Sequence, residues 1–295
     1  MKVSTYLVAP ALALSGLMLG AAPAAAHAMT AHTCTGTLAA PGLLAGNYPG
    51  SVVINGVCAV DGGAAVVDGN LTLTPGSALN ATFALNDVKH KGSSSLHVHG
   101  KLNVEKGAVL VLGCEAGHFP CSDDQNATTH DRVDGNLTGS EALAIIVHAT
   151  KFDGSVTQVG GGGGAPAMTC AVPTSGVFHA IGSPVYSDYE DVKIAGNLTV
   201  EKLRSCWFGA LRDWVGGTVR VEGNKFGDPD ADEVNSNVVH GAMKCFKNTP
   251  AVQYGDAVGG TPNKVSGSAS GECAFTVKLH NPVPAGPLTP ISVHA

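Results

Sequence analysis

The sequence predicts an all-β protein built as a β-solenoid, in which coils of about 20 residues stack on one another. Three observations lead to this prediction. A five-residue pattern, apolar-x-Gly-x-apolar, recurs along the chain, and glycine is abundant whereas aromatic residues make up only 5%. Long amphipathic helical patterns are absent, and only residues 203–215 suit a short helix.

The recurring pattern supplies the strands and corners of the predicted coils. Its central glycines from Gly135 onward are 19 to 26 residues apart, the length that a β-solenoid coil requires. Before Gly135 the steps are irregular, which leaves room for loops or for a partial coil. The copies are 54–58, 67–71, 98–102, 133–137, 152–156, 194–198, 215–219, 239–243 and 265–269, with a degraded copy at 174–178.

The segment from Val67 to Leu73 illustrates how a strand of one coil would bury one face. Apolar Val67, Leu71 and Leu73 alternate with polar residues, so the apolar side chains lie on the same side of the strand. One coil cannot cover this face alone and must stack on the next, and the glycine allows a close approach or a corner. The same spacing of short strands is also compatible with an antiparallel β-sandwich, which stays as the alternative fold.

The N-terminus has the layout of a removable export signal. Lys2 precedes a short apolar run, and small residues with an A-x-A site follow. We therefore assign residues 1–26 to a signal peptide, with cleavage after Ala28 as the alternative, and we expect a secreted, extracellular protein. The apolar run is too short to span a bilayer, and no membrane span is predicted in the mature chain. The remaining divisions are an N-terminal extension or cap at 27–50, the β-helix domain at 51–280 and a Pro-rich tail at 281–295.

The cysteines predict disulfide bonds. All eight lie after the signal peptide, and an even number in an exported chain indicates disulfides. Cys114 and Cys121 form the best-supported pair because they close a short loop. Proximity along the chain adds the pairs Cys34–Cys58, Cys170–Cys206 and Cys245–Cys273, and other pairings stay open. No C-x-x-C motif points to a zinc site instead.

Two stretches carry a resemblance to a known group of proteins. The phrases V-x-G-N-L-T at 67–72 and 133–138, and the run from Pro250 through Pro262 to Cys273, resemble secreted actinobacterial proteins of the pectate-lyase-like superfamily. The likeness covers roughly residues 50–276. It implies a right-handed parallel β-helix, and it transfers no catalytic residues because that group has no assigned activity.

The charge balance limits the class of partner. The formal net charge is −6, and no basic cluster interrupts the sequence, which argues against nucleic acid as a partner. An acidic polymer would also be repelled unless a bound cation intervened.

One acidic loop is a candidate cation site. Asp228, Asp230, Asp232 and Glu233 lie close together, and carboxylates in a loop can coordinate Ca²⁺, the one cofactor that the sequence suggests. The EF-hand pattern does not fit, however, and a solvated Asp/Pro turn between coils is the favoured interpretation of the loop. Calcium-dependent lyase chemistry would also need a base. Arg212, Arg220 and Lys225 are near in sequence, but nothing selects one of them.

Other polar groups give weaker signals. His97 and His99 alternate on one strand and could bind a transition metal if a third ligand joined them. Asp123–Asp124 and 188–191 hold neighbouring carboxylates of the kind that glycosidases use, although loops often carry such pairs. The glycine run 160–164 is interpreted as a flexible loop.

Five N-x-[ST] triplets start at asparagines, and three of them share one position of the repeat. We expect these three amides to hydrogen-bond along the axis of the stack. The triplets start at Asn70, Asn80, Asn126, Asn136 and Asn197.

Two functions agree with these observations. The first is a secreted, non-catalytic β-helix with a binding or structural role in the extracellular space or cell envelope, whose flat faces meet a glycan or another envelope protein. The alternative is a calcium-dependent polysaccharide lyase or glycoside hydrolase that acts on acidic glycans. Carboxylates and an arginine gathered on one sheet face would favour the enzyme, and rows of Thr, Asn and Ser would favour the binding protein.

Overall fold

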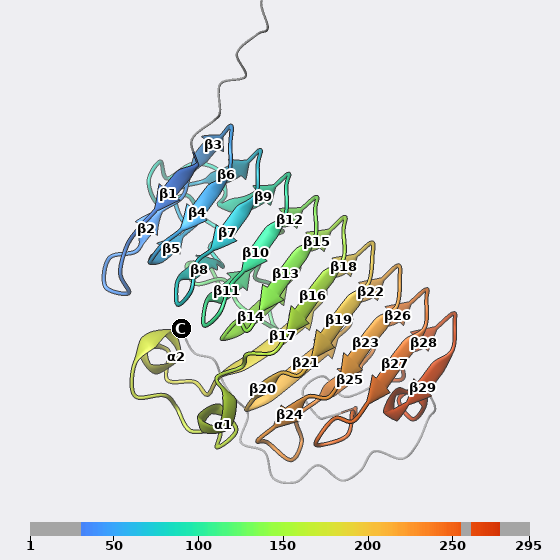
Figure 1. The fold of residues 1–295 in the computed structure, drawn as a ribbon. Coiled ribbons are helices and arrows are strands. Elements are labelled where there is room, and N and C mark those ends of the chain that lie inside the picture. The colour runs from blue at the N-terminus through green and yellow to red at the C-terminus, as the bar shows by residue number, and fades with distance from the viewer. Residues whose placement is uncertain (1–30, 255–260, 278–295) are drawn as a thin grey trace, which may run out of the picture.

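A computed structural model describes residues 31–254 and 261–277, which form a right-handed parallel β-helix (Figure 1). Neighbouring strands in each long sheet pair in parallel, which rules out the antiparallel sandwich. The predicted signal peptide, 1–26, and the predicted tail, 281–295, lie outside the described residues.

Three sheets form the sides of the stack, and a short ladder forms one corner. Sheet A contains β1 (His32–Cys34), β4 (Val52–Ile54), β7 (Leu71–Leu73), β10 (Leu102–Val104), β13 (Leu137–Ser140), β16 (Val156–Val159), β19 (Leu198–Glu201), β23 (Val219–Glu222), β27 (Met243–Phe246) and β29 (Ala269–Gly271). Sheet B contains β2 (Gly42–Leu43), β5 (Val57–Ala59), β8 (Ala78–Ala81), β11 (Val109–Leu112), β14 (Ala144–His148), β17 (Tyr186–Glu190), β21 (Trp207–Leu211) and β25 (Glu233–Asn235). Sheet C contains β3 (Gly46–Tyr48), β6 (Ala64–Val67), β9 (Ser95–Val98), β12 (Arg132–Val133), β15 (Lys151–Phe152), β18 (Lys193–Ile194), β22 (Trp214–Val215), β26 (Val238–Val239) and β28 (Lys264–Val265). The short ladder joins β20 (Arg204–Ser205) to β24 (Lys225–Phe226).

The core is a continuous apolar interior that runs along the stack. Leu137, Val156, Leu198 and Val219 pair in register on successive strands of sheet A and are almost completely buried. Such stacking covers the apolar face that each coil leaves open. The prediction of coils with a shared dry interior is therefore confirmed.

Glycines mark the corner between sheets C and A. The amide of Gly100 donates to the carbonyl of Gly69 at 3.0 Å, and a Cβ on Gly100 would lie 2.4 Å from that carbonyl oxygen. The close approach excludes any side chain at this point. The same contact continues through later coils as far as Gly267.

Two glycines of the predicted series do not belong to this corner. Gly56 instead approaches Gly36 at another corner, and Gly176 begins the helix α2 (Gly176–Ala180). Gly196 stacks directly on Gly154, so the degraded copy at 174–178 is not a coil. The step from Gly154 to Gly196 is 42 residues and resembles two coils, because the insertion 160–185 adds about the length of one coil to a single coil.

Insertions account for the irregular steps, and they hold most of the helical residues. The long excursions occupy 83–94, 113–130 and 160–185. The last one carries α1 (Gly164–Ala167) and α2, while the short 3₁₀ helix η1 (Glu272–Ala274) follows β29. No helix in the described part of the chain could cross a bilayer.

The structure corrects one local expectation and adds detail to two others. Residues 203–215 form β20, β21 and β22 and not a helix, because pairing with the neighbouring coils outweighs the local pattern. Residues 32–48, within the segment assigned to an extension or cap, already form β1, β2 and β3. The glycine run adopts left-handed backbone at every residue from 160 to 164, and α1 begins at its last glycine.

All four expected disulfide pairs are present. They are Cys34–Cys58, Cys114–Cys121, Cys170–Cys206 and Cys245–Cys273. Proximity along the chain was a sufficient guide because two bonds join neighbouring coils, one closes the lobe 113–130 and one ties the insertion 160–185 to the start of β21.

The three equivalent asparagines bond along the axis as expected, although to backbone and not to one another. The side-chain oxygens of Asn70, Asn136 and Asn197 accept the amide N–H groups of Lys101, Ser155 and Thr218, each one coil ahead, at 2.8–2.9 Å. Asn80 and Asn126 lie outside this column. The Asn80 side chain accepts from Thr82, and the Asn126 amide N–H donates to Asp124.

Candidate functional site

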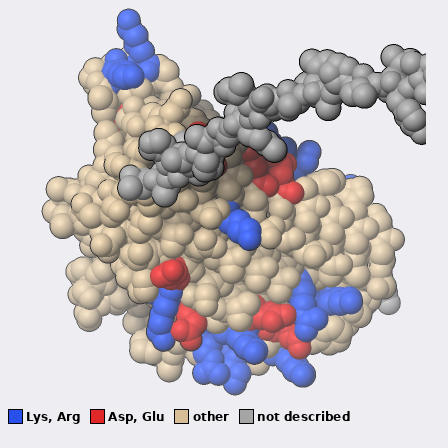
Figure 2. All heavy atoms as spheres, turned by 45° about the horizontal axis from the view of Figure 1, so that its top comes forward, with Lys and Arg blue, Asp and Glu red and all other residues tan. Residues whose placement is uncertain are grey.

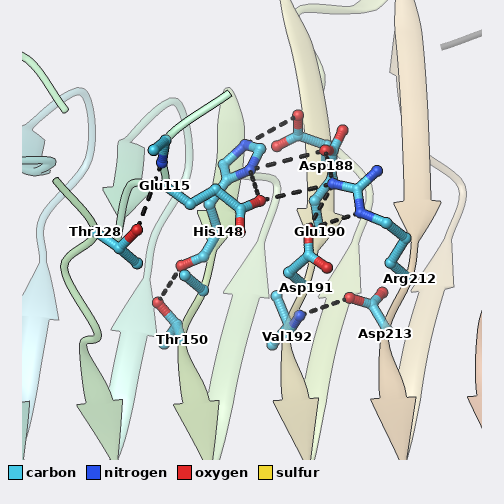
Figure 3. A network of polar contacts seen from close by, with 12 residues as sticks. Glu115, Thr128, His148, Thr150, Asp188, Glu190, Asp191, Val192, Arg212 and Asp213 are labelled. Carbon is cyan, nitrogen blue, oxygen red and sulfur yellow. Dashed lines mark hydrogen bonds and ion pairs between the residues drawn. The ribbon is translucent and has the colours of Figure 1, made fainter. Parts of the chain in front are cut away.

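A cluster of charged side chains lies on the outer face of sheet B, where β14 and β17 end. Strand alternation turns Val147 and Tyr189 into the core and His148, Asp188 and Glu190 outward. The parallel register then places His148 directly beside Glu190. Arg212 follows β21 on the next coil (Figure 3).

Insertions cover this outer face. Ala167 of α1 and Phe178 of α2 pack on Ile146 and Tyr186, and the bond Cys170–Cys206 ties this insertion to the start of β21. The other end of the face is covered by the lobe 113–130, which the bond Cys114–Cys121 closes.

The lobe reaches the cluster through two side chains. The ring of Phe119 stacks on the His148 ring, with centroids 4.0 Å apart and planes within 3°, and Glu115 contributes a carboxylate. The His148 side chain retains only 2% of its exposure. The cluster is therefore a covered site and not an open groove.

His148 lies among three carboxylates without a hydrogen bond to any of them. Its Nε2 is 3.5 Å from Asp188 Oδ2, and its Nδ1 is 3.8 Å from Glu115 Oε1 and 3.9 Å from Glu190 Oε2. Both ring nitrogens are buried without a hydrogen-bond partner. At these separations the interactions are ion pairs and not hydrogen bonds.

Arg212 supplies the second positive group. Its guanidinium donates to Asp191 Oδ2 at 2.7 Å from Nε and to Glu190 Oε2 at 2.9 Å from a terminal nitrogen. The same terminal nitrogen lies 3.6 Å from Glu115 Oε1. One guanidinium thus contacts acidic groups from both the lobe and the sheet.

The cluster strongly perturbs the pKa values of its members. Burial alone would lower the pKa of His148, but Asp188, Glu115 and Glu190 raise it to about 10. Burial raises the pKa of Glu190 to about 7, with the Asp188 charge adding to the effect. Burial would also raise the pKa of Glu115, yet His148 and Arg212 lower it to about 2. At neutral pH, His148 is therefore a cation that pairs with the ionised lobe carboxylate.

This arrangement can hold a lobe in place, and it could also hold a metal. Ligand atoms of Glu115, His148 and Glu190 lie within 4.8 Å of one another. However, an Arg212 nitrogen already contacts both carboxylate oxygens of this set. The guanidinium supplies the positive charge that a metal would bring, so the chemistry that fits best is ionic attachment of the lobe.

Only part of this cluster is visible in the sequence. The sequence pattern indicates the carboxylates of 188–191, and it relates Arg212 only to the acidic loop. No sequence pattern indicates the partnership of His148 with Glu115. The insertion 160–185 hides that residues 148 and 190 are neighbours, and no local pattern reveals it.

The acidic loop does not form a cluster. No three of Asp228, Asp230, Asp232 and Glu233 bring ligand atoms within 4.8 Å of one another in the described chain. Asp228 accepts the amide N–H of Asp230 at 3.0 Å, and Glu233 accepts from Trp207 Nε1 at 3.1 Å. Asp232 is completely buried, and burial raises the pKa of its carboxyl well above the usual value. Asp228 and Asp230 are half-buried and fit a turn at the surface, whereas Asp232 and Glu233 are buried and Glu233 begins β25, so the solvated-turn interpretation does not cover the whole segment.

The pair Asp123–Asp124 serves the loops around it. Asp123 accepts the amide N–H groups of Ala84 and Leu85 at 2.6–3.1 Å, and Asp124 accepts the amide N–H of Asn126. A carboxylate used in this way stabilises local backbone. The two acids do not face each other across a shared space.

The outer face of sheet A differs from that of sheet B. One row of outward positions runs in register across this face and carries no charge before Arg220. The row consists of Thr33, Val53, Thr72, Asn103, Thr138, Thr157, Thr199, Arg220, Lys244 and Ser270. We call the seven positions from Thr33 to Thr199 the threonine row. Its members are exposed or half-buried.

Charged side chains also gather elsewhere on the surface. Figure 2 shows adjoining groups of Lys, Arg, Asp and Glu in the lower part of the face in view, with largely uncharged surface above them. Comparison with family models, with curated proteins and with solved structures finds no match to this chain.

Proposed function

We propose that this protein is a secreted, non-catalytic β-helix that binds an extended, uncharged glycan along the outer face of sheet A. The observation that carries the proposal is the threonine row, which places one polar or small side chain on each successive strand without an intervening charge. The four disulfides of the protein support an extracellular role.

The spacing of the row suits a polymer that repeats regularly. Neighbouring strands lie about 4.8 Å apart, so the hydroxyls of Thr138, Thr157 and Thr199 recur at nearly that distance. An extended pyranose chain repeats over a similar length, and each sugar could meet one rung. Those three hydroxyls make no hydrogen bond with other described side chains and remain free to donate or accept.

The charge around the row favours a neutral ligand. The adjacent outward row contains Glu201, Glu105 directly follows β10, and the whole chain has a net charge of −6. These charges would repel a polyuronate. A neutral polysaccharide avoids this penalty and can replace the water bound to the hydroxyls.

The test is a binding screen with the disulfide-bonded mature protein. Isothermal titration and pull-down assays would use soluble xylan and insoluble β-glucan, with polygalacturonate as the charged comparison. We expect binding to a neutral polymer and loss of binding in Thr138→Arg/Thr157→Arg, which places bulk and charge in the middle of the row.

A matched control puts the same side chain on a different surface. Ala195→Arg changes an exposed residue that directly follows β18 of sheet C and should bind as the unmodified protein does. Absence of binding to every neutral polymer, or equal loss in the control, would overturn the proposal.

The alternative is a lyase or hydrolase of acidic glycans, and the carboxylate and arginine cluster on sheet B is the observation that favours it. Substrate would have to displace Phe119 and the lobe to reach His148, which makes this the second choice. Incubation with polyuronates, with and without EDTA, tests it directly. Calcium-dependent formation of unsaturated product would replace the binding proposal with an enzymatic one.

A further inference from the structure

His97 and His99 face outward from sheet C, as their alternation predicts, and the neighbouring coil supplies a third polar group. Val98 of β9 pairs with Val133 of β12, so Asp134 at the end of β12 lies beside both histidines. Sequence alone could not identify this partner because the insertion 113–130 separates the two coils.

The three side chains converge on one point. His97 Nε2 lies 3.1 Å from Asp134 Oδ1, and His99 Nδ1 lies 2.7 Å from Asp134 Oδ2. The two imidazole rings have centroids 4.1 Å apart. One ligand atom from each residue falls within a common distance of 4.8 Å, so small side-chain adjustments would place all three around a single ion.

We propose that His97, His99 and Asp134 form a binding site for a divalent transition metal, with Zn²⁺ as the test ion. Imidazole nitrogen and carboxylate oxygen are ligands that Zn²⁺ accepts at about 2.0–2.2 Å. The three side chains keep 27–43% of their exposure, so water or a ligand group from solvent can complete the coordination.

A second carboxylate is placed to orient one of the ligands. Asp68, one coil before β9, has its Oδ1 3.8 Å from His99 Nε2. With His99 Nδ1 on the metal, the N–H at Nε2 would point toward Asp68. This is the usual arrangement of a metal-bound histidine and its supporting carboxylate.

Arg132 is the group that opposes the metal. Its Nε donates to Asp134 Oδ1 at 2.6 Å, and its terminal nitrogen donates to Asp153 at 2.6 Å. The guanidinium therefore shares Asp134 with any bound ion and repels it. Removing this charge should strengthen metal binding, whereas a purely structural ion pair predicts no such effect.

The experiment is isothermal titration of Zn²⁺ into the disulfide-bonded mature protein. His97→Ala/His99→Ala should lose one equivalent of bound Zn²⁺ per protein, and Asp134→Asn should bind Zn²⁺ at least ~100-fold more weakly. Each variant removes or weakens side chains that coordinate the ion directly. Asp68→Asn should weaken binding by about 10- to 100-fold. Arg132→Gln should bind more tightly than the unmodified protein.

His240→Ala is the matched control, because His240 is an exposed histidine next to β26 of the same sheet. This control should still bind the equivalent of Zn²⁺ that the double variant loses. Zn²⁺ should raise the melting temperature of the unmodified protein and of the control, but not that of the double variant. Without metal, all three proteins should melt at the same temperature. Unchanged stoichiometry in the double variant, equal loss in the control, or no Zn²⁺ binding at all would overturn the proposal.

Discussion

The outer faces of sheets A and B share a backbone geometry but differ in what covers them. Sheet A leaves its threonine row in contact with solvent, whereas sheet B is covered by two insertions and holds an ion cluster beneath one of them. The strands themselves are alike in length and register. The comparison teaches that loop insertions, and not the coil repeat, decide which side of this β-helix can meet a partner.

The largest expected difference between the faces concerns two arginines. Arg212→Met leaves Glu190 and Asp191 without their donor in a covered site, and we expect a loss of about 3–5 kcal/mol in the free energy of unfolding. Arg220→Met removes an exposed partner of Glu201 and Glu222 on sheet A and should cost no more than about 1 kcal/mol. Chemical denaturation of both variants measures the difference, and equal losses would contradict the contrast.

The second difference is the pH dependence that the covered face imposes. The pKa of His148 is raised from 6.5 to about 10 in the folded protein. Its contribution to stability is therefore complete below pH 6.5 and is lost as the pH rises toward 10. The pKa of Glu190 is raised from 4.5 to about 7. Its contribution to stability is therefore also lost as the pH rises, but over a lower range, from 4.5 to about 7.

Removing the imidazole should flatten the alkaline part of this curve. We expect the stability of the unmodified protein to fall by about 2 kcal/mol or more between pH 7 and pH 10, and His148→Gln to abolish most of that fall. His118→Gln, an exposed histidine in the same lobe, is the control and should retain it. Parallel curves for all three proteins would show that His148 does not hold a proton in the folded state.

The smallest effect is expected on the exposed face. Thr157→Ala removes a half-buried hydroxyl that bonds no other described side chain, so the stability should change by less than about 0.5 kcal/mol. Thermal unfolding checks this. A larger loss would mean that the row supports the sheet, and any loss of glycan binding in row variants could then reflect unfolding.

The sequence predicted the fold well because the information is local. Alternation within each strand and a glycine at each corner are visible in short segments such as 67–73, and stacking follows from them. The disulfides were predictable for the same reason, since a bond such as Cys34–Cys58 joins residues about one coil apart.

The candidate sites were less predictable because they depend on register between coils. His148 meets Glu190, and His99 meets Asp134, only after insertions of unrelated length have been set aside. The same difficulty made Gly176 look like part of the repeat. The acidic segment 228–233 shows the opposite case. Its carboxylates are close in sequence but contact different partners, so closeness in sequence does not make them one site.

The positions of two disulfides have a consequence for how this stack opens. Cys34–Cys58 joins the first two coils of the described chain, and Cys245–Cys273 joins its last two. A terminal coil has a neighbour on one side only, so it is the natural starting point for fraying. With each terminal coil tethered to the next, a frayed end stays within reach of its partner and closes again, and loss of structure has to start where every coil is held from both sides.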